Sequence, residues 1–173
     1  MTGAFAWLGQ FFEFFGSLFP RLIIVRATEN GIKWVRGHKV VALNPGVHIY
    51  WPILTDVEVM VTARQTINLK PQTLTTADNR KVIVSAVVVY RIHDIVRAIG
   101  RINWDVAETV MDIAQAGVVD VVRSMTLEEL MGSDVENQLT RTCRKQLRRY
   151  GVYVSRAAFT DLAEARVFRL VQG

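Results

Sequence analysis

The run of residues 82–92 is the sequence feature that most constrains the fold, because its eleven residues are mostly β-branched or aromatic. Such residues favour strands, and the polar segment 76–79 before the run has the short side chains that favour a tight turn. Side chains alternate between the two faces of a strand, and both alternating sets of this run are largely apolar. We therefore predict a central strand that is covered on both faces, with Val88 in the core.

Before this run, short apolar segments alternate with turn residues. Strands are predicted over 22–28, 32–37, 40–43, 47–51, 56–63 and 66–69. Tight turns are predicted at 29–31 (ENG) and at 44–46 (NPG), where proline fixes φ and glycine tolerates a positive φ. The first half of the chain is therefore expected to be rich in β-structure.

After Asp94 the apolar residues take a helical spacing, which predicts four helical segments. The predicted N-caps are Asp94 and Asp105, and the predicted capping boxes are Thr126 with Glu129 and Ser133 with Glu136. The helix over 106–125 has a face of small apolar residues, and the later helix that Gly151 ends buries Cys143. Residues 152–162 alternate like one last strand, and a short helix is expected from Ala163 onward.

Length and composition favour a single core. The chain has 173 residues, of which 50% are hydrophobic and 21% are charged. We therefore expect one globular α+β domain over residues 21–162, in which a mixed or antiparallel sheet is packed by the later helices. Residues 163–173 would begin a C-terminal helix.

The first 20 residues differ from the rest, because their only charged side chain is Glu13. Residues 4–19 are predicted to form a helix with a narrow polar stripe of Gln10, Glu13 and Ser17 on an otherwise aromatic surface. A bilayer span needs about 20 apolar residues, so shallow in-plane insertion fits at least as well as a full span. The side chains predicted to insert are Phe5, Trp7, Leu8, Phe11, Phe12, Phe14, Phe15 and Phe19.

The polar stripe is expected to face another copy of the chain or the lipid headgroups. A helix buried in an oligomer interface is the alternative to membrane contact. Arg21 and Arg26 follow the apolar segment, so the positive-inside tendency predicts that the globular part lies on the cytoplasmic side. Removing residues 1–20 is expected to leave a folded domain in the soluble fraction.

The net charge of +5 and the isoelectric point near 9.7 fit an anionic partner, such as lipid headgroups or nucleic acid. The most basic predicted surface is a helix face with Arg141, Arg144, Lys145 and Arg148. This face lacks the interleaved aromatic residues that stack on bases. Nucleic acid is therefore not expected, and a solvated helix face is the plain interpretation.

No pattern in the sequence indicates catalysis, a cofactor or a metal site. His38, His48 and His93 lack the mutual spacing of metal ligands, and there is no glycine-rich phosphate loop, Gly-x-Ser-x-Gly elbow or Cys-x-x-Cys pair. The single Cys143 excludes an intramolecular disulfide. We therefore expect a protein that is not an enzyme and needs no cofactor.

Several short motifs follow one another in an order typical of one family. They are ENG at 29–31, VRG at 35–37, NPGVH at 44–48, WP at 51–52, LTTADN at 74–79, VVVYRI at 87–92 and YGV at 150–152. In this order and spacing the chain resembles the SPFH or band 7 domain, the family of stomatin, prohibitin and flotillin.

The resemblance implies a membrane-anchored scaffold that assembles into rings or arcs, defines a membrane microdomain and holds or shields partner proteins, membrane proteases among them. It implies no enzymatic step. A regulatory module that docks on a membrane protease or channel is the alternative function. Members of the family typically continue into a long helix, whereas this sequence stops at Gly173, so we expect a ring or arc rather than a closed cage.

Overall fold

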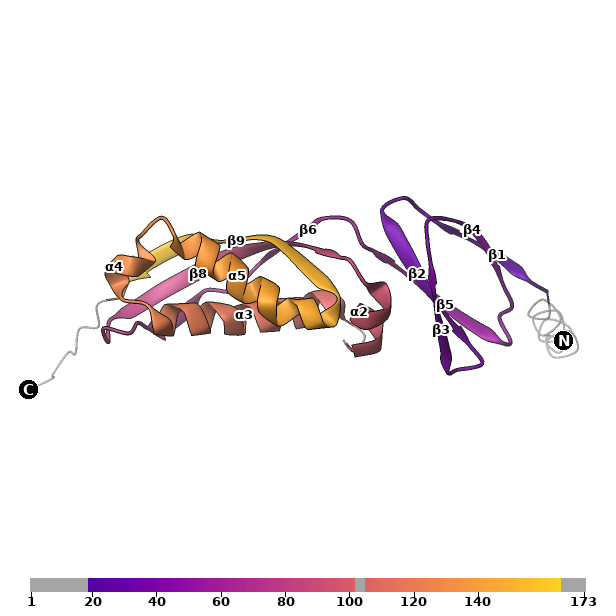
Figure 1. The fold of residues 1–173 in the computed structure, drawn as a ribbon, viewed down its shortest axis with the longest axis horizontal. Helices are drawn as coiled ribbons and strands as arrows, with labels where there is room; N and C mark the ends of the chain where they lie inside the picture. Colours follow the sequence, from indigo (N-terminus) through magenta and orange to yellow (C-terminus); the bar gives the residue numbers. More distant parts are fainter. Residues whose placement is uncertain (1–18, 102–104, 166–173) are drawn as a thin grey trace, which may run out of the picture. The chain divides into compact units, whose positions relative to one another are not determined.

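The computed structural model describes residues 19–101 and 105–165. The chain divides into two compact units, residues 1–63 and 64–173, where the sequence had predicted a single core (Figure 1). The reason lies in the strand pairing. The described strands before residue 64 pair only with one another, so they close sheets of their own and do not extend the sheet of the central strand.

The first unit contains two antiparallel sheets. Strand β1 (Arg21–Val25) pairs with β4 (Gly46–Tyr50), while β2 (Glu29–Val35) lies between β3 (Lys39–Leu43) and β5 (Thr55–Val61). The small core of this unit includes Val25, Ile32 and Leu43, which are all buried. At the predicted turn 44–46 the chain bends at Pro45, and Gly46, with a φ of 145°, begins β4; this bend leads from one sheet into the other.

The predicted turn at 29–31 is wrong, because these residues begin strand β2. The chain reverses earlier, where the Glu29 amide donates to the Arg26 carbonyl at 3.0 Å. Gly31 lies inside the sheet, and a Cβ at this position would be 3.2 Å from the Glu58 carbonyl oxygen and 3.3 Å from the Leu43 Cβ. This glycine therefore permits close packing of the neighbouring strand.

The second unit is built on β8 (Lys81–Ile92). Strands β6 (Gln65–Asn68) and β7 (Gln72–Thr75) pair along one edge of β8, and β9 (Val152–Glu164) pairs along the other, all antiparallel. Strand β7 had not been predicted. The helices are α2 (Ile95–Arg101), α3 (Val106–Ser124), α4 (Leu127–Leu130), α5 (Val135–Leu147) and the 3₁₀ helix η1 (Arg148–Tyr150).

Helices α3 and α5 lie side by side along the sheet of β8 and β9 (Figure 1). One face of β8 is buried beneath them, through Val82, Val84, Ala86, Val88, Tyr90 and Ile92. On the other face Lys81 and Arg91 are exposed, Ile83 is 38% exposed, and Ser85, Val87 and Val89 are half-buried. The prediction that both faces are covered is therefore wrong, because the described helices pack against only one of them.

Strand β9 confirms the last predicted strand and extends it. Ile83 pairs with Ala163 and Val82 pairs with Glu164, so the helix predicted from Ala163 does not begin there. The reason is that the backbones of Ala163 and Glu164 pair with the long strand β8, which keeps them extended. The remainder of that predicted helix, from residue 166, lies outside the described residues.

The helix caps follow the sequence with one exception. Asp105 accepts from the Glu108 amide at 2.9 Å, and Thr126 with Glu129 forms a complete capping box. The box predicted for Ser133 with Glu136 is wrong, because Asp134 is the N-cap of α5 and makes no side-chain cap bond. The Asp134 carboxylate accepts from the side-chain amide of Asn137 at 3.0 Å instead.

Candidate membrane-facing surface

The strand pair β1–β4 presents four exposed aliphatic side chains on one face. Leu22 pairs with Ile49, and Ile24 pairs with Val47, so the four lie next to one another on the same side. Their exposed fractions are 69% and 63% for the first pair and 70% and 65% for the second. We call this surface the apolar ribbon face.

The alternation of side chains along a strand explains how this face arises. In β1 the side chains of Ile23 and Val25 alternate with those of Leu22 and Ile24 and point the other way. Val25 is part of the core of the first unit. A strand with one wet face normally carries polar residues there, whereas β1 is aliphatic on both faces after Arg21. Large clusters of exposed apolar side chains mark sites of protein or membrane contact.

More exposed apolar residues lie just before β1 and just after β4 in the sequence. Pro20 alone separates Phe19 from β1, and Trp51 follows β4 directly; Phe19 and Trp51 are both exposed. Arg21 begins β1 and pairs with Tyr50, which ends β4, so the chain enters and leaves this pair of strands at the same end. Ile53 and Leu54, in the loop after Trp51, are exposed as well. Of these exposed residues, Phe19 alone was predicted to contact the membrane.

The other predicted membrane residues lie outside the described part of the chain. They are Phe5, Trp7, Leu8, Phe11, Phe12, Phe14 and Phe15, together with the polar stripe of Gln10, Glu13 and Ser17. Among the helices of residues 19–101 and 105–165, none combines the length and the apolar character that crossing a bilayer requires.

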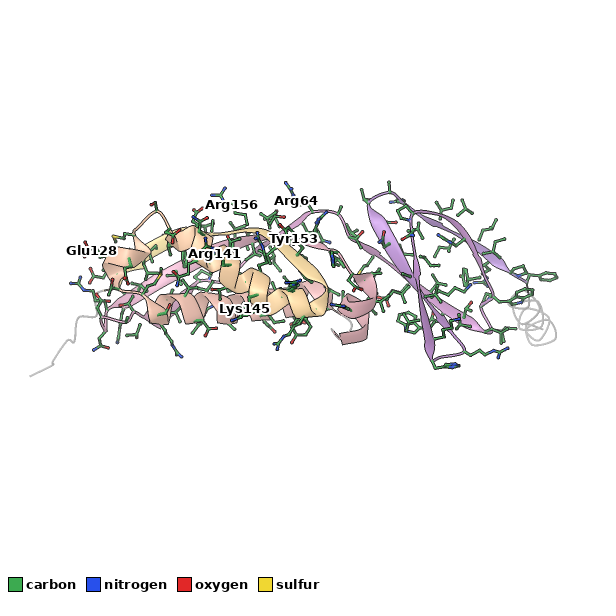
Figure 2. All side chains as sticks on the ribbon, viewed as in Figure 1. Arg64, Glu128, Arg141, Lys145, Tyr153 and Arg156 are labelled. Atoms are coloured by element: carbon green, nitrogen blue, oxygen red, sulfur yellow. The ribbon has the colours of Figure 1, made fainter. Side chains whose placement is uncertain are left out.

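The predicted basic face of α5 is only partly available. Arg141 and Lys145 on α5 are exposed (Figure 2). Arg148, which begins η1, is exposed as well. Arg144 is half-buried: its Nε donates to the Val154 carbonyl at 3.0 Å, and its guanidinium carbon lies 5.0 Å from the centre of the Tyr153 ring. Arg144 therefore holds α5 against β9 and is not available to a ligand.

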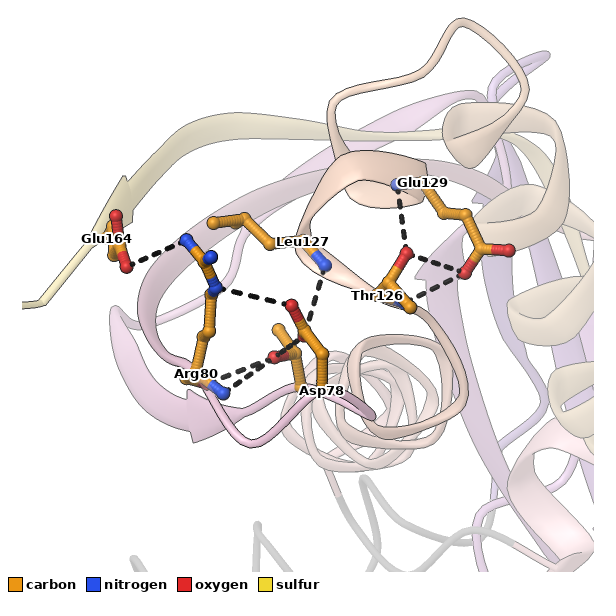
Figure 3. A network of polar contacts seen from close by, with 7 residues as sticks. Asp78, Arg80, Thr126, Leu127, Glu129 and Glu164 are labelled. Carbon is orange, nitrogen blue, oxygen red and sulfur yellow. Dashed lines mark hydrogen bonds and ion pairs between the residues drawn. The ribbon is translucent and has the colours of Figure 1, made fainter.

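A polar network joins the turn before β8 to α4 and to β9 (Figure 3). The Asp78 carboxylate accepts from the Thr76 hydroxyl and from the Leu127 amide, at 3.2 Å for the latter. Arg80 bridges Asp78 at 3.4 Å and Glu164 at 3.3 Å. The hydrogen bond from Thr76, aided by the Leu127 amide and Arg80, lowers the pKa of Asp78. This network is structural, since each member bonds to the protein itself.

The described residues offer little reactive chemistry. Burial raises the pKa of the Cys143 thiol to about 11, so it stays protonated and unreactive at neutral pH. No group of three histidine, cysteine or acidic side chains that could hold a metal ion occurs within 19–101 and 105–165. The surface with the clearest chemical character is therefore the apolar ribbon face.

The fold is α+β: small antiparallel sheets in the first unit, and in the second a sheet with helices on one face. Residues 23–169 match the model of the SPFH domain / Band 7 family, and the chain belongs to that family. The family expected from the sequence motifs is thereby confirmed.

Two archaeal proteins, both described as uncharacterized, are similar to this chain. One, from Methanocaldococcus jannaschii, is 28% identical over 144 residues, which are 82% of this chain and 71% of that protein. The other, from Archaeoglobus fulgidus, is 25% identical over 158 residues, which are 90% of this chain and 63% of that protein. The chain thus spans about two thirds of the length of these relatives.

Proposed function

We propose that this protein is a membrane-associated scaffold, which assembles with copies of itself on a bilayer and organises or shields partner membrane proteins there. The proposal includes no catalytic step, which agrees with the general character of the SPFH family. The observation that carries it is the apolar ribbon face, which exposes Leu22, Ile24, Val47 and Ile49.

Lipid is the occupant that best fits this face. The strand β1 follows directly on the aromatic segment 4–19, so two lipid-seeking surfaces adjoin in the chain. Fully burying one Val, Leu or Ile side chain is worth about 1.5–3 kcal/mol, so transferring four exposed ones into a bilayer contributes several kcal/mol. Arg21, the first residue of β1, and Arg26, which follows the strand, are both exposed, which suits the anionic headgroups of a cytoplasmic leaflet.

The apolar ribbon face changes what we expect of a chain that lacks residues 1–20. The sequence alone predicted that this deletion would release a soluble domain. Because β1 and β4 remain after the deletion, we now expect the shortened protein to retain part of its affinity for vesicles.

Self-assembly is supported by complementary charge on two neighbouring helices. On α3 the exposed acids Glu108 and Asp112 lie one turn apart, and on α5 the exposed bases Arg141 and Lys145 do the same. An acidic stripe and a basic stripe on one unit allow the basic stripe of one copy to meet the acidic stripe of the next. Such head-to-tail contacts generate rings or open arcs, depending on the rotation between copies.

Flotation with phosphatidylcholine vesicles tests the membrane contact. The variant combines Leu22→Thr with Ile49→Thr, two paired and exposed residues whose replacement keeps the propensity for a strand. In the chain lacking residues 1–20, where the aromatic segment cannot mask the effect, we expect roughly a 30-fold or greater loss of vesicle affinity. The full chain should lose less.

The matched control combines Val40→Thr with Val61→Thr, on the three-stranded sheet of the same unit, where both residues are also exposed. It should float like the parent chain. If the two double variants float equally well, or if both lose affinity equally, the apolar ribbon face is not the membrane contact.

A further inference from the structure

The first unit contains an open hollow of about 420 Å³ beside the apolar ribbon face. One side of the hollow is cationic, with Lys33, Arg36 and Lys39 among the lining residues. The other side is apolar and aromatic and includes Ile49, Trp51 and Leu54. Ile49 belongs to both surfaces, so the hollow and the apolar ribbon face are continuous.

The strand register explains why the cations gather here. Val35 pairs with Lys39, and Lys33 lies two residues before Val35, so the two lysines share a face of the sheet. The turn between these strands carries Arg36 at a φ of 52°, and the Arg36 amide donates to the Leu54 carbonyl at 2.8 Å. That hydrogen bond fastens the cationic turn to the loop that supplies the apolar side.

The cations of the hollow are unbalanced by acid. No aspartate or glutamate is among the residues that line it. In the stretches of chain that the structure describes, none of the ion pairs involves Lys33, Arg36 or Lys39. Three cations around one hollow without a carboxylate favour an anionic ligand.

We propose that this hollow binds the phosphate headgroup of an anionic phospholipid, and that the lipid's acyl chains run along Ile49 toward the apolar ribbon face. This inference rests on the proposed membrane association. A free phosphate would contact the cationic side alone, whereas a phospholipid would also contact the apolar side through Ile49 and Leu54. The hollow would therefore give the membrane contact a preference for anionic lipid.

The test uses the full chain in a non-ionic detergent and dihexanoyl phosphatidylglycerol as the probe, with binding and stoichiometry followed by native mass spectrometry. We expect one lipid per chain. The variant that combines Lys33→Gln with Lys39→Gln should bind it at least about tenfold more weakly, since it removes two of the three cations that line the hollow. A matched control, Arg123→Gln with Arg148→Gln, removes the same charge from exposed positions of the second unit and should bind like the parent chain.

Three results would overturn the proposal: an unchanged affinity in the Lys33 and Lys39 variant, an equal loss of affinity in the matched control, or inorganic phosphate binding as tightly as the lipid. The first excludes the hollow, the second indicates non-specific attraction, and the third indicates a free-phosphate site. Flotation of the full-length Lys33 and Lys39 variant with pure phosphatidylcholine vesicles reports on the membrane association separately. The flotation of this variant should stay unchanged. Loss of flotation would therefore argue against the proposed membrane association, whereas unchanged lipid binding in native mass spectrometry would argue against the hollow.

Discussion

Val88 lies in the second half of β8 with 0% of its surface exposed, on the buried face of the strand. We predict that Val88→Asp prevents folding of the second unit, because an unpaired buried carboxylate costs several kcal/mol against a total stability of about 5–15 kcal/mol. Circular dichroism during thermal unfolding measures this. The control Ile83→Asp lies on the opposite, 38% exposed side of the strand and should keep a cooperative transition. A cooperative melt of Val88→Asp would contradict the assigned core.

Gly151 and Gly37 separate two reasons for a glycine. Both have a positive φ, at 73° and 74°. A Cβ on Gly151 would lie 2.3 Å from the Asp94 carbonyl oxygen, whereas a Cβ on Gly37 would meet nothing within 4 Å. We predict that Gly37→Ala costs about 1 kcal/mol from backbone strain and that Gly151→Ala costs several. Urea unfolding of each variant measures its loss in the free energy of unfolding. Equal losses in the two variants would contradict the close contact at Gly151.

At the scale of elements, the turn between β7 and β8 depends on an ionised Asp78. Its pKa is lowered in the folded chain, first by the Thr76 hydroxyl, so the folded state favours the carboxylate. This stabilising contribution is fully present above the ordinary carboxyl pKa of about 3.9 and is lost as the pH falls through the lower folded value. We predict that the melting temperature of the parent chain falls more steeply below pH 4 than that of Asp78→Asn. Parallel curves for the two proteins would show that Asp78 contributes nothing to the acid sensitivity.

Most elements of the second unit could be predicted because their signals are local. The capping box of Thr126 and Glu129 lies within four consecutive residues, and the β-branched run of β8 needs no partner to be recognised. The predictions failed where pairing with a distant strand determines the local structure. Residues 29–31 have a turn-like composition but pair with β3 or β5, and β7 is only four residues long and follows Pro71. Pairing partners distant in sequence leave no local pattern.

The candidate site could be predicted only in part. Residues 4–19 are rich in aromatic side chains, so the prediction that they insert into lipid can be made from the sequence alone. The apolar ribbon face is spread over two strands, and its four residues meet only because Leu22 pairs with Ile49 and Ile24 with Val47. Its one local signal is that β1 is aliphatic at consecutive positions, and we had interpreted this only as strand propensity. The role of Arg144 likewise depends on β9 lying beside α5.

At the scale of the whole molecule, we expect assembly to depend on the two charged helix stripes. Lys145→Glu should weaken self-association measured by mass photometry, because it places an acid where a neighbouring copy presents Asp112. Adding Asp112→Lys to the same chain should restore assembly, since the pair is then reversed in sign. If the double variant assembles no better than the single one, these stripes do not meet. A parent chain that stays monomeric on membranes would favour the alternative role, a module docking on a membrane protease or channel.

The most direct test of the account is whether the apolar ribbon face enters the bilayer. Cys143 is buried with a raised pKa, so a dye that responds to polarity can be attached selectively to an introduced cysteine at Ile49→Cys, or at the exposed control Arg123→Cys. Emission spectra are then recorded for the full chain with and without phosphatidylcholine vesicles. We predict that vesicles shift the emission from position 49 to shorter wavelength and leave that from position 123 unchanged. An emission from position 49 that stays water-like while the protein floats with the vesicles would contradict the account.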